Sequence, residues 1–321
     1  MSNVAIGENA IPVVDLERLV RGVFVAADLQ LLRQAVEHFG FLYVINHGIS
    51  DSCIRDARAS ARLFFNQTLA AKQALSISRH HRGWLAAGGA QMAADVLPDM
   101  KESFIWGAAL DTNHPSEHRL RGPNQWPEHL PEMHGPAEVW FECAERLACL
   151  LLAGLAVSYD LDAKYFLRHS DRPLSRASYV YYPSRVARVG LEEQFGVGPH
   201  TDFGVLTVLS QDAVGGLQVE VGENNWIDVP PKEDALIVNV GDLLCRWSNG
   251  CMQSARHRVI RPVDVDRVSL VLAFDPNPET VIDPVDFRSN EAPKPDTVTC
   301  GEYLDWRFSK AFAYRRTGEA R

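Results

Sequence analysis

Three side chains in the second half of the sequence have the residue types and the spacing of a metal site. His200 and Asp202 are separated by one residue, and His257 follows in a later apolar segment. In an extended strand, residues i and i+2 point to the same face, so we expect His200 and Asp202 to lie side by side. Two histidines and one carboxylate on one face leave coordination positions open, which suits a non-haem Fe(II) ion that binds O2.

A second pair of residues strengthens this interpretation, because a lone histidine in a strand is usually a hydrogen-bonded structural residue. Arg267 and Ser269 follow His257, after a turn that contains Pro262. The same i, i+2 rule places both side chains on one face. A guanidinium presents a planar fork of donors that matches a carboxylate, and a serine hydroxyl adds one further hydrogen bond. The sequence therefore predicts a metal beside a binding site for an organic acid.

The segments that carry these residues read as short strands. Apolar runs alternate with turn signals such as Pro183, Gly215-Gly216 and Asn249-Gly250, which is typical of a sandwich, jelly roll or barrel. The runs are Ser178–Tyr182, Val205–Leu209, Leu217–Val221, Ala235–Val240, Arg256–Ile260 and Val268–Phe274.

The first half of the chain has a mostly helical pattern. Apolar residues recur at helical spacing over residues 29–39, and Gly40 follows as a stop signal. Residues 41–45 are aromatic and β-branched and read as a strand, whereas residues 137–159 read as a long helix. The aromatic tail, residues 300–316, is helical again. We expect a mainly β (α+β) fold with helices before and after a β core.

Composition restricts the function classes. The chain has 321 residues, 46% hydrophobic and 23% charged, as in an ordinary globular protein. A net charge of −9 without a basic run argues against nucleic acid or an anionic membrane as a partner. No apolar stretch reaches the roughly 18 residues of a membrane span, and no secretory signal is evident. Scattered cysteines predict free thiols, so we expect a cytoplasmic protein, monomeric by default, that acts on a small molecule.

Further motifs extend along nearly the whole chain in order. They are Ile11–Leu16, His38–Gly48, Tyr181–Pro183, His200–Gln211, Gly215–Val219, Asn239–Asp242, Trp247–Gly250, His257–Val259 and Asp275–Asn277. Together they resemble the 2-oxoglutarate and Fe(II)-dependent dioxygenase superfamily, in the branch of isopenicillin N synthase and the plant-type soluble dioxygenases.

The resemblance implies a double-stranded β-helix, or jelly roll. It divides the chain into an N-terminal helical or mixed region (1–170), a catalytic core (171–278) and a C-terminal helical extension (279–321), which form one structural unit. It implies Fe(II), 2-oxoglutarate as co-substrate and O2, and release of succinate and CO2 as a small molecule is oxidised.

The resemblance also assigns residues to the co-substrate. Arg267, Ser269 and Tyr182 would bind its distal carboxylate, and Leu206 and Val259 would line its slot. The family pattern is broken at Val180, where many relatives have an asparagine near the oxo-acid end of the co-substrate.

The substrate side is less well defined by the sequence. Arg82, Trp84 and Phe104 are candidates by analogy with the helical region that covers the family's pocket. Many relatives have paired phenylalanines after the Arg-x-Ser motif, and here Leu272 and Ala273 replace them and would widen the pocket. The C-terminal aromatic helix is either a lid or part of the core.

Alternatives remain at this point. An iron-dependent oxidase of the same family would use the Arg-x-Ser motif for its own substrate or activator instead of 2-oxoglutarate. A non-catalytic module for an organic acid or a metal belongs to a different class. An ethylene-forming relative would use 2-oxoglutarate itself as the main substrate. The identity of the primary substrate does not follow from the sequence, because loops and helices shape such pockets.

Overall fold

A computed structural model describes residues 11–92, 97–109, 118–184, 195–287 and 296–317. Its largest element is an eight-stranded sheet, in which β1 pairs parallel with β2 and the other neighbours pair antiparallel. In spatial order the strands are β1 (Val13–Asp15), β2 (Phe41–Ile45), β10 (Ala235–Val240), β7 (Leu206–Gln211), β12 (Arg267–Phe274), β5 (Arg176–Tyr182), β4 (Glu102–Gly107) and β3 (Gly83–Leu85).

A smaller sheet lies against one face of the large sheet. Its strands are β6 (Val197–His200), β11 (His257–Val259), β8 (Leu217–Glu220) and β9 (Trp226–Asp228). Apolar residues of both sheets form one buried cluster between them, with Tyr43, Tyr182 and Ile237 from the large sheet and Leu217 and Val259 from the small one. The expected double-stranded β-helix is therefore confirmed. A separate two-stranded sheet joins β13 (Val281–Ile282) and β14 (Val298–Thr299).

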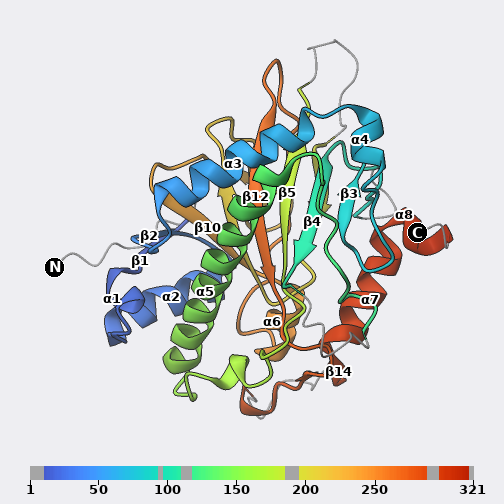
Figure 1. The fold of residues 1–321 in the computed structure, drawn as a ribbon. Coiled ribbons are helices and arrows are strands. Elements are labelled where there is room, and N and C mark those ends of the chain that lie inside the picture. The colour runs from blue at the N-terminus through green and yellow to red at the C-terminus, as the bar shows by residue number, and fades with distance from the viewer. Residues whose placement is uncertain (1–10, 93–96, 110–117, 185–194, 288–295, 318–321) are drawn as a thin grey trace.

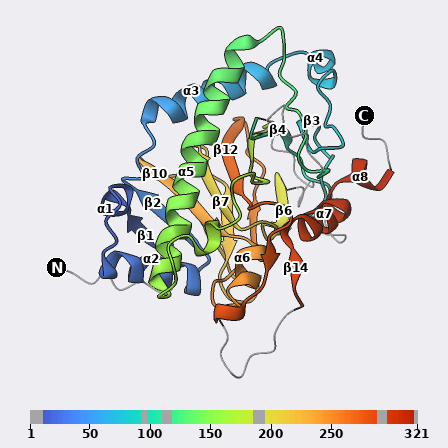
Figure 2. The same cartoon turned by 60° about the horizontal axis from the view of Figure 1, so that its bottom comes forward.

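Helices cover the other face of the large sheet. The helices α3 (Asp51–Phe65) and α5 (His134–Ser158) contact β12, and α2 (Ala26–His38) packs on α5 (Figure 1). The helix α7 (Cys300–Ala311) lies at the β3–β4 side of the sheet, away from α2, in both views (Figure 2). Shorter helices are α1 (Glu17–Val20), α4 (Leu69–Gln73), α6 (Asp242–Trp247) and α8 (Ala313–Thr317), and 3-10 turns occupy Pro131–Met133, Tyr165–Leu167 and Val285–Phe287.

Local sequence signals explain several element ends. Ser50 caps α3, since its hydroxyl accepts a hydrogen bond from the Cys53 N–H. Gly40 follows α2 with a φ of 63°, a conformation that glycine adopts without strain. The six strands expected between residues 176 and 275 are all present as β5, β7, β8, β10, β11 and β12.

The first half of the chain is less helical than its pattern predicts. Besides β2, it supplies β1, β3 and β4, so four strands of the large sheet come from residues 13–107. Strands β3 and β4 are buried on both faces, and such strands lack the polar alternation that distinguishes a strand from a buried helix. None of the described helices is long and apolar enough to cross a membrane.

Candidate metal centre and the cavity beside it

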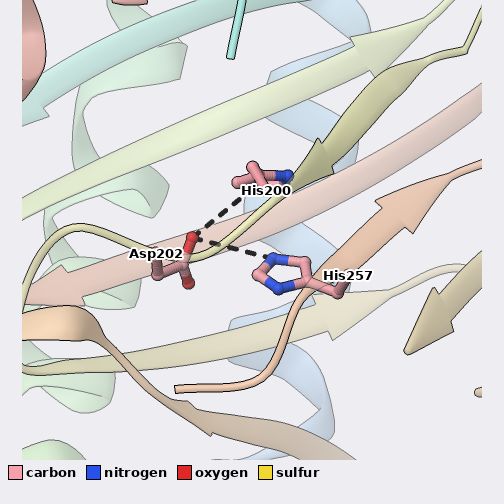
Figure 3. A group of neighbouring side chains, drawn as sticks. All are labelled: His200, Asp202 and His257. Atoms are coloured by element: carbon pink, nitrogen blue, oxygen red, sulfur yellow. Dashed lines mark ion pairs between the residues drawn. The ribbon is translucent and has the colours of Figure 1, made fainter. Parts of the chain in front are cut away.

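The three predicted metal ligands meet at the junction of β6 and β11. His257, the first residue of β11, pairs directly with His200, the last residue of β6. Nε2 of each imidazole lies 3.7 Å from Oδ1 of Asp202 (Figure 3). One ligand atom from each residue fits within 4.8 Å of the others, so a single ion can contact all three. Asp202 itself lies beyond the end of β6, so the chain's turn, rather than a strand face, brings it to the histidines.

Both imidazoles are oriented by backbone carbonyl groups. Nδ1 of His200 lies 2.9 Å from the Gly198 carbonyl oxygen, and Nδ1 of His257 lies 3.2 Å from the Ala255 carbonyl oxygen. A carbonyl only accepts, so each Nδ1 carries the proton and each Nε2 presents a lone pair. Burial and the neighbouring His257 lower the pKa of His200 to about 3, which keeps its imidazole neutral and ready to bind a metal.

The carboxylate of Asp202 is fixed by its second oxygen. Oδ2 accepts hydrogen bonds from Thr207 Oγ1 at 2.5 Å and from Asn239 Nδ2 at 2.7 Å, which leaves Oδ1 facing the histidines. Burial alone would raise the pKa of Asp202, but His257, His200 and these hydrogen bonds outweigh it and lower the pKa to about 2. The group is therefore an anion over the whole neutral range, as a metal ligand requires.

A cavity between the two sheets adjoins these ligands. It is lined by Arg267, Ser269 and Tyr182 along β12 and β5, and by Val259 of β11. The side chain of Arg267 is fully buried, and its guanidinium lies over the Tyr182 ring, 4.6 Å from the centroid. The structure thus brings these four predicted co-substrate residues to the same cavity, three from the large sheet and Val259 from the small one.

Three polar atoms at this end of the cavity lack protein partners, although Nη2 of Arg267 donates to Oε1 of Gln211 at 3.5 Å. Nε and Nη1 of Arg267 and Oγ of Ser269 are buried without a hydrogen bond among the described residues. Buried polar atoms are rarely left so, and a buried charge is normally paired. A carboxylate between Arg267 and Ser269 would satisfy both side chains, so the residues fit the acid end of 2-oxoglutarate.

The prediction for Leu206 is wrong. Its side chain lies in the core on the helix-covered face of the sheet, and Thr207 and Leu209 of the same strand line the cavity instead. The i, i+2 rule fails here because residues 201–205 are not extended strand, so the alternation does not run unbroken from Asp202 to Leu206.

Three of the four predicted substrate residues lie outside the cavity. Trp84 and Phe104 stand on β3 and β4 rather than on helices, and both point into the helix-covered core. The guanidinium of Arg82 donates to the backbone carbonyls of His80 and His81. Ala273 does line the cavity. The neighbours of the misplaced residues line it instead, namely His81, Leu85, Ser103 and Ile105.

Further cavity residues were not anticipated. Lys101 and Arg176 bring positive charge to the wall, and Phe308 and Phe312 contribute aromatic rings from the C-terminal part. The aromatic spacing of the tail signalled Phe308, but no motif marked the two cations. This side of the cavity is therefore formed by separated parts of the chain, with residues from 81–105, Arg176 of β5 and two residues of the C-terminal part.

Comparisons with known proteins agree with this geometry. A family model described as "non-haem dioxygenase in morphine synthesis N-terminal" matches residues 11–129, and one described as "2OG-Fe(II) oxygenase superfamily" matches residues 172–276. The chain is 33% identical to the 2-oxoglutarate-dependent dioxygenase thnC of Trichoderma harzianum, over 91% of this chain and 90% of that protein. It is 31% identical to the validamycin A dioxygenase of Streptomyces hygroscopicus subsp. limoneus, over 92% and 85%.

Solved structures of the same architecture carry the expected ligands. A full-length Neurospora crassa protein in complex with alpha-KG and thymine superposes with a TM-score of 0.83, at 26% identity, over 97% of this chain and 99% of that one. JOX2 in complex with 2OG, Fe and JA superposes with a TM-score of 0.77, at 27% identity, over 93% and 84%. The chain belongs to the 2OG-Fe(II) oxygenase superfamily and is a 2-oxoglutarate-dependent dioxygenase that uses Fe(II) and O2.

Proposed function

We propose that His200, Asp202 and His257 hold the Fe(II) ion, and that the enzyme hydroxylates a small organic molecule. The arrangement that carries this proposal is the pairing of His200 with His257 across two strands, with one Asp202 oxygen 3.7 Å from each imidazole. Both Nε2 atoms face the same oxygen, and the opposite side of the group opens to the cavity. A facial set of three ligands leaves room for a bidentate co-substrate and O2.

We further assign the distal carboxylate of 2-oxoglutarate to Arg267 and Ser269, with Tyr182 beside them. The support is the set of buried donors without partners on the first two residues. Val259 forms the apolar side of the slot. At the position of the family asparagine, Val180 lines the cavity and offers no hydrogen bond to the oxo-acid end. That end would therefore depend on the metal for its orientation.

These positions indicate what the bound iron and what the residues of the protein would each contribute to the reaction. Bound iron with 2-oxoglutarate and O2 supplies an oxidant strong enough to attack a C–H bond, with release of succinate and CO2. The residues of this chain hold the ligands in one orientation: two carbonyls fix the imidazoles, and Thr207 and Asn239 fix Asp202. The apolar walls of the cavity exclude water from the reacting centre.

Anaerobic titration of the Fe(II)-loaded protein with 2-oxoglutarate tests this proposal. We expect a weak visible charge-transfer band that saturates with 2-oxoglutarate and is absent in His257→Ala. Arg267→Leu should retain iron and require far more 2-oxoglutarate for the same band. Iron binding without a band, and without succinate under air, would instead favour the oxidase alternative. No iron binding by the folded wild-type protein would refute the metal assignment.

A further inference from the structure

The cavity extends away from Arg267 to a second wall built from β3, β4, β5 and α7. Strand β5 separates β12 from β4, so the backbones at Arg267 and Lys101 lie two strand spacings, roughly 10 Å, apart. Along β12, the cavity-lining residues run from Arg267 to Ala273, and Ala273 pairs with Arg176. Lys101 precedes Glu102, which pairs with Tyr181, so Lys101 lies level with Tyr182 and Arg267, whereas Arg176 lies at the other end of the cavity. This second wall, which we call the substrate wall, therefore adjoins the place assigned to 2-oxoglutarate at Lys101 and extends away from it toward Arg176.

Two cationic side chains line the substrate wall, and each is ion-paired with a buried carboxylate. Nζ of Lys101 lies 3.4 Å from Oδ2 of Asp99, whose Oδ1 already accepts a hydrogen bond from the Gly198 N–H. Nη1 of Arg176 lies 2.5 Å from Oδ2 of Asp275. An ammonium has three donors, and its contact with Asp99 is an ion pair in which Oδ2 has no hydrogen bond among the described residues, so Lys101 has capacity for a ligand in the cavity.

A third cation gives this region an excess of positive charge. Arg82 is 3% exposed, and in the described part of the chain its guanidinium contacts only backbone carbonyls, with Nε left unpaired. Burial, followed by the nearby Arg176, lowers the pKa of Arg82 to about 9, so the group is still charged at neutral pH. The charges of Lys101 and Arg176 are balanced by their paired carboxylates, whereas the charge of Arg82 is not balanced. A low-dielectric cavity beside this surplus favours an anionic occupant.

The remainder of the substrate wall is apolar and partly aromatic. Its residues include Leu85, Met92, Ile105, Phe203, Phe308 and Phe312. The ring of His81 lies between two of them, 4.5 Å from the Phe308 centroid and 4.7 Å from that of Phe312. Arg176 lies over the Phe308 ring at 4.8 Å. An occupant with a flat or bulky apolar body would bury its surface here, while its charge faces the cations.

We propose that the primary substrate is an organic acid with an apolar, ring-sized body, and that Lys101 binds its anionic group while Arg176 and Phe308 contact the body. This inference rests on the proposed function, because it places the acid beside the Fe(II) ligands. It names Lys101 as a specificity-determining residue. The affinity gained from one charge-assisted hydrogen bond corresponds to about tenfold or more in a dissociation constant.

The test uses redox-inert Zn(II) in place of iron, with saturating 2-oxoglutarate so that the Arg267 end is filled. We titrate pairs of compounds by ligand-observed NMR, each pair consisting of a ring-bearing acid and its primary amide. The first pair is 3-phenylpropanoate and 3-phenylpropanamide, and further pairs are their longer and bicyclic homologues. We expect the acid of at least one pair to bind tenfold or more tightly than its amide. The double variant Lys101→Met/Asp99→Asn should abolish that preference. The Asp99→Asn change is included because Lys101→Met alone would leave the buried Asp99 carboxylate unpaired. Lys310→Met on the exposed face of α7 should retain it.

Three outcomes would overturn the proposal. Acids and amides could bind equally in every pair, or no acid could bind while 2-oxoglutarate is present. The double variant could also keep the acid preference and lose affinity for 2-oxoglutarate instead, which would assign Lys101 to the co-substrate. The melting temperature of the double variant, with Zn(II) and 2-oxoglutarate bound, shows that it is folded. Failure to bind Zn(II) at all would refute the metal assignment, whereas normal binding of Zn(II) and 2-oxoglutarate without acid preference refutes only this inference.

Discussion

At the scale of single residues, Asn239 and Thr207 orient Asp202, which we propose as a metal ligand. Both donate to Oδ2, so Oδ1 is the oxygen that remains for the ion. We expect Asn239→Leu and Thr207→Val each to weaken Zn(II) affinity about 10- to 100-fold, the usual cost of losing a residue that orients a metal ligand. Competition with a fluorescent chelator measures the affinity. Asn277→Ala removes a similarly buried amide that does not line the cavity and should leave the affinity unchanged. Unaltered affinity in both site variants would contradict this assignment.

His81 should make the stability of the protein depend on pH. Burial, together with Arg176 and other nearby cations, places its pKa well below 6.5 in the folded state. The unfolded chain therefore binds a proton below pH 6.5 that the folded protein does not bind, and stability falls as the pH falls. Between pH 6 and pH 5, we expect the wild type to lose about 1 kcal/mol of unfolding free energy relative to His81→Phe. Urea denaturation of both metal-free proteins measures this difference, and parallel pH profiles would contradict it.

The residue scale also shows where sequence reasoning ends. The proposed ligands His200 and His257 could be picked out from the sequence because the chemistry of iron restricts the residue types, and the structure places them side by side. The errors at Trp84, Phe104 and Leu206 share one cause. Each belongs to or adjoins a strand, where side chains alternate between two apolar environments, the helix-covered core and the cavity. Both faces accept apolar residues, so the pattern does not say which residues point inward.

At the scale of elements, the passage from α2 to β2 depends on Gly40. A Cβ added there would lie 2.0 Å from the Gln253 carbonyl oxygen, at a φ of +63°. Gly22 has a similar φ of +75° but no atom within 4 Å of such a Cβ. We expect Gly22→Ala to cost about 1 kcal/mol of unfolding free energy, for the backbone strain alone. Gly40→Ala should cost at least about 3 kcal/mol, because the clash with backbone adds to that strain.

Denaturation of the two glycine variants and the wild type under one condition provides the comparison. Equal costs would mean that the loop near Gln253 shifts freely, and that this contact does not fix the start of β2. Since β2 pairs with β10, whose Asn239 holds Asp202, a large cost would connect this turn to the metal site.

Element prediction succeeded where strands have clear ends. The runs bounded by proline, glycine or asparagine were placed within about two residues, because these residues terminate strands for steric reasons. The strand expected to carry both His200 and Asp202 ends at His200, as β6 (Val197–His200), and it contains a glycine and a proline, which usually argue against a strand. It tolerates them because β6 is an edge strand of the small sheet, where a proline without an N–H removes the fewest ladder hydrogen bonds.

At the scale of the whole molecule, the large sheet separates two buried regions of different character. The face toward the helices is a continuous apolar core, whereas the face toward the small sheet holds both an apolar cluster and the polar cavity. The first region stabilises the fold, and the buried charge of Lys72 at its edge is paired with Glu102. The second accepts the buried guanidinium of Arg267, at a cost in stability that a bound carboxylate would offset.

This balance predicts opposite effects of Arg267→Met on stability and on binding. In the metal-free protein the variant should be as stable as the wild type, or more stable by about 1–4 kcal/mol, because an unpaired buried charge is replaced by an apolar side chain. With Zn(II) and 2-oxoglutarate at 100 times its dissociation constant, the wild type should gain about 2.7 kcal/mol relative to Zn(II) alone, and the variant almost nothing.

Chemical denaturation with and without 2-oxoglutarate measures both effects. Succinate, which lacks the oxo-acid chelate, serves as the control ligand and should stabilise the wild type less. If Arg267→Met destabilised the metal-free protein by several kcal/mol and still responded to 2-oxoglutarate, the guanidinium would be a packing element instead of the carboxylate site. A variant that is stable and unresponsive would show that the fold maintains an unfavourable buried charge in order to bind the co-substrate.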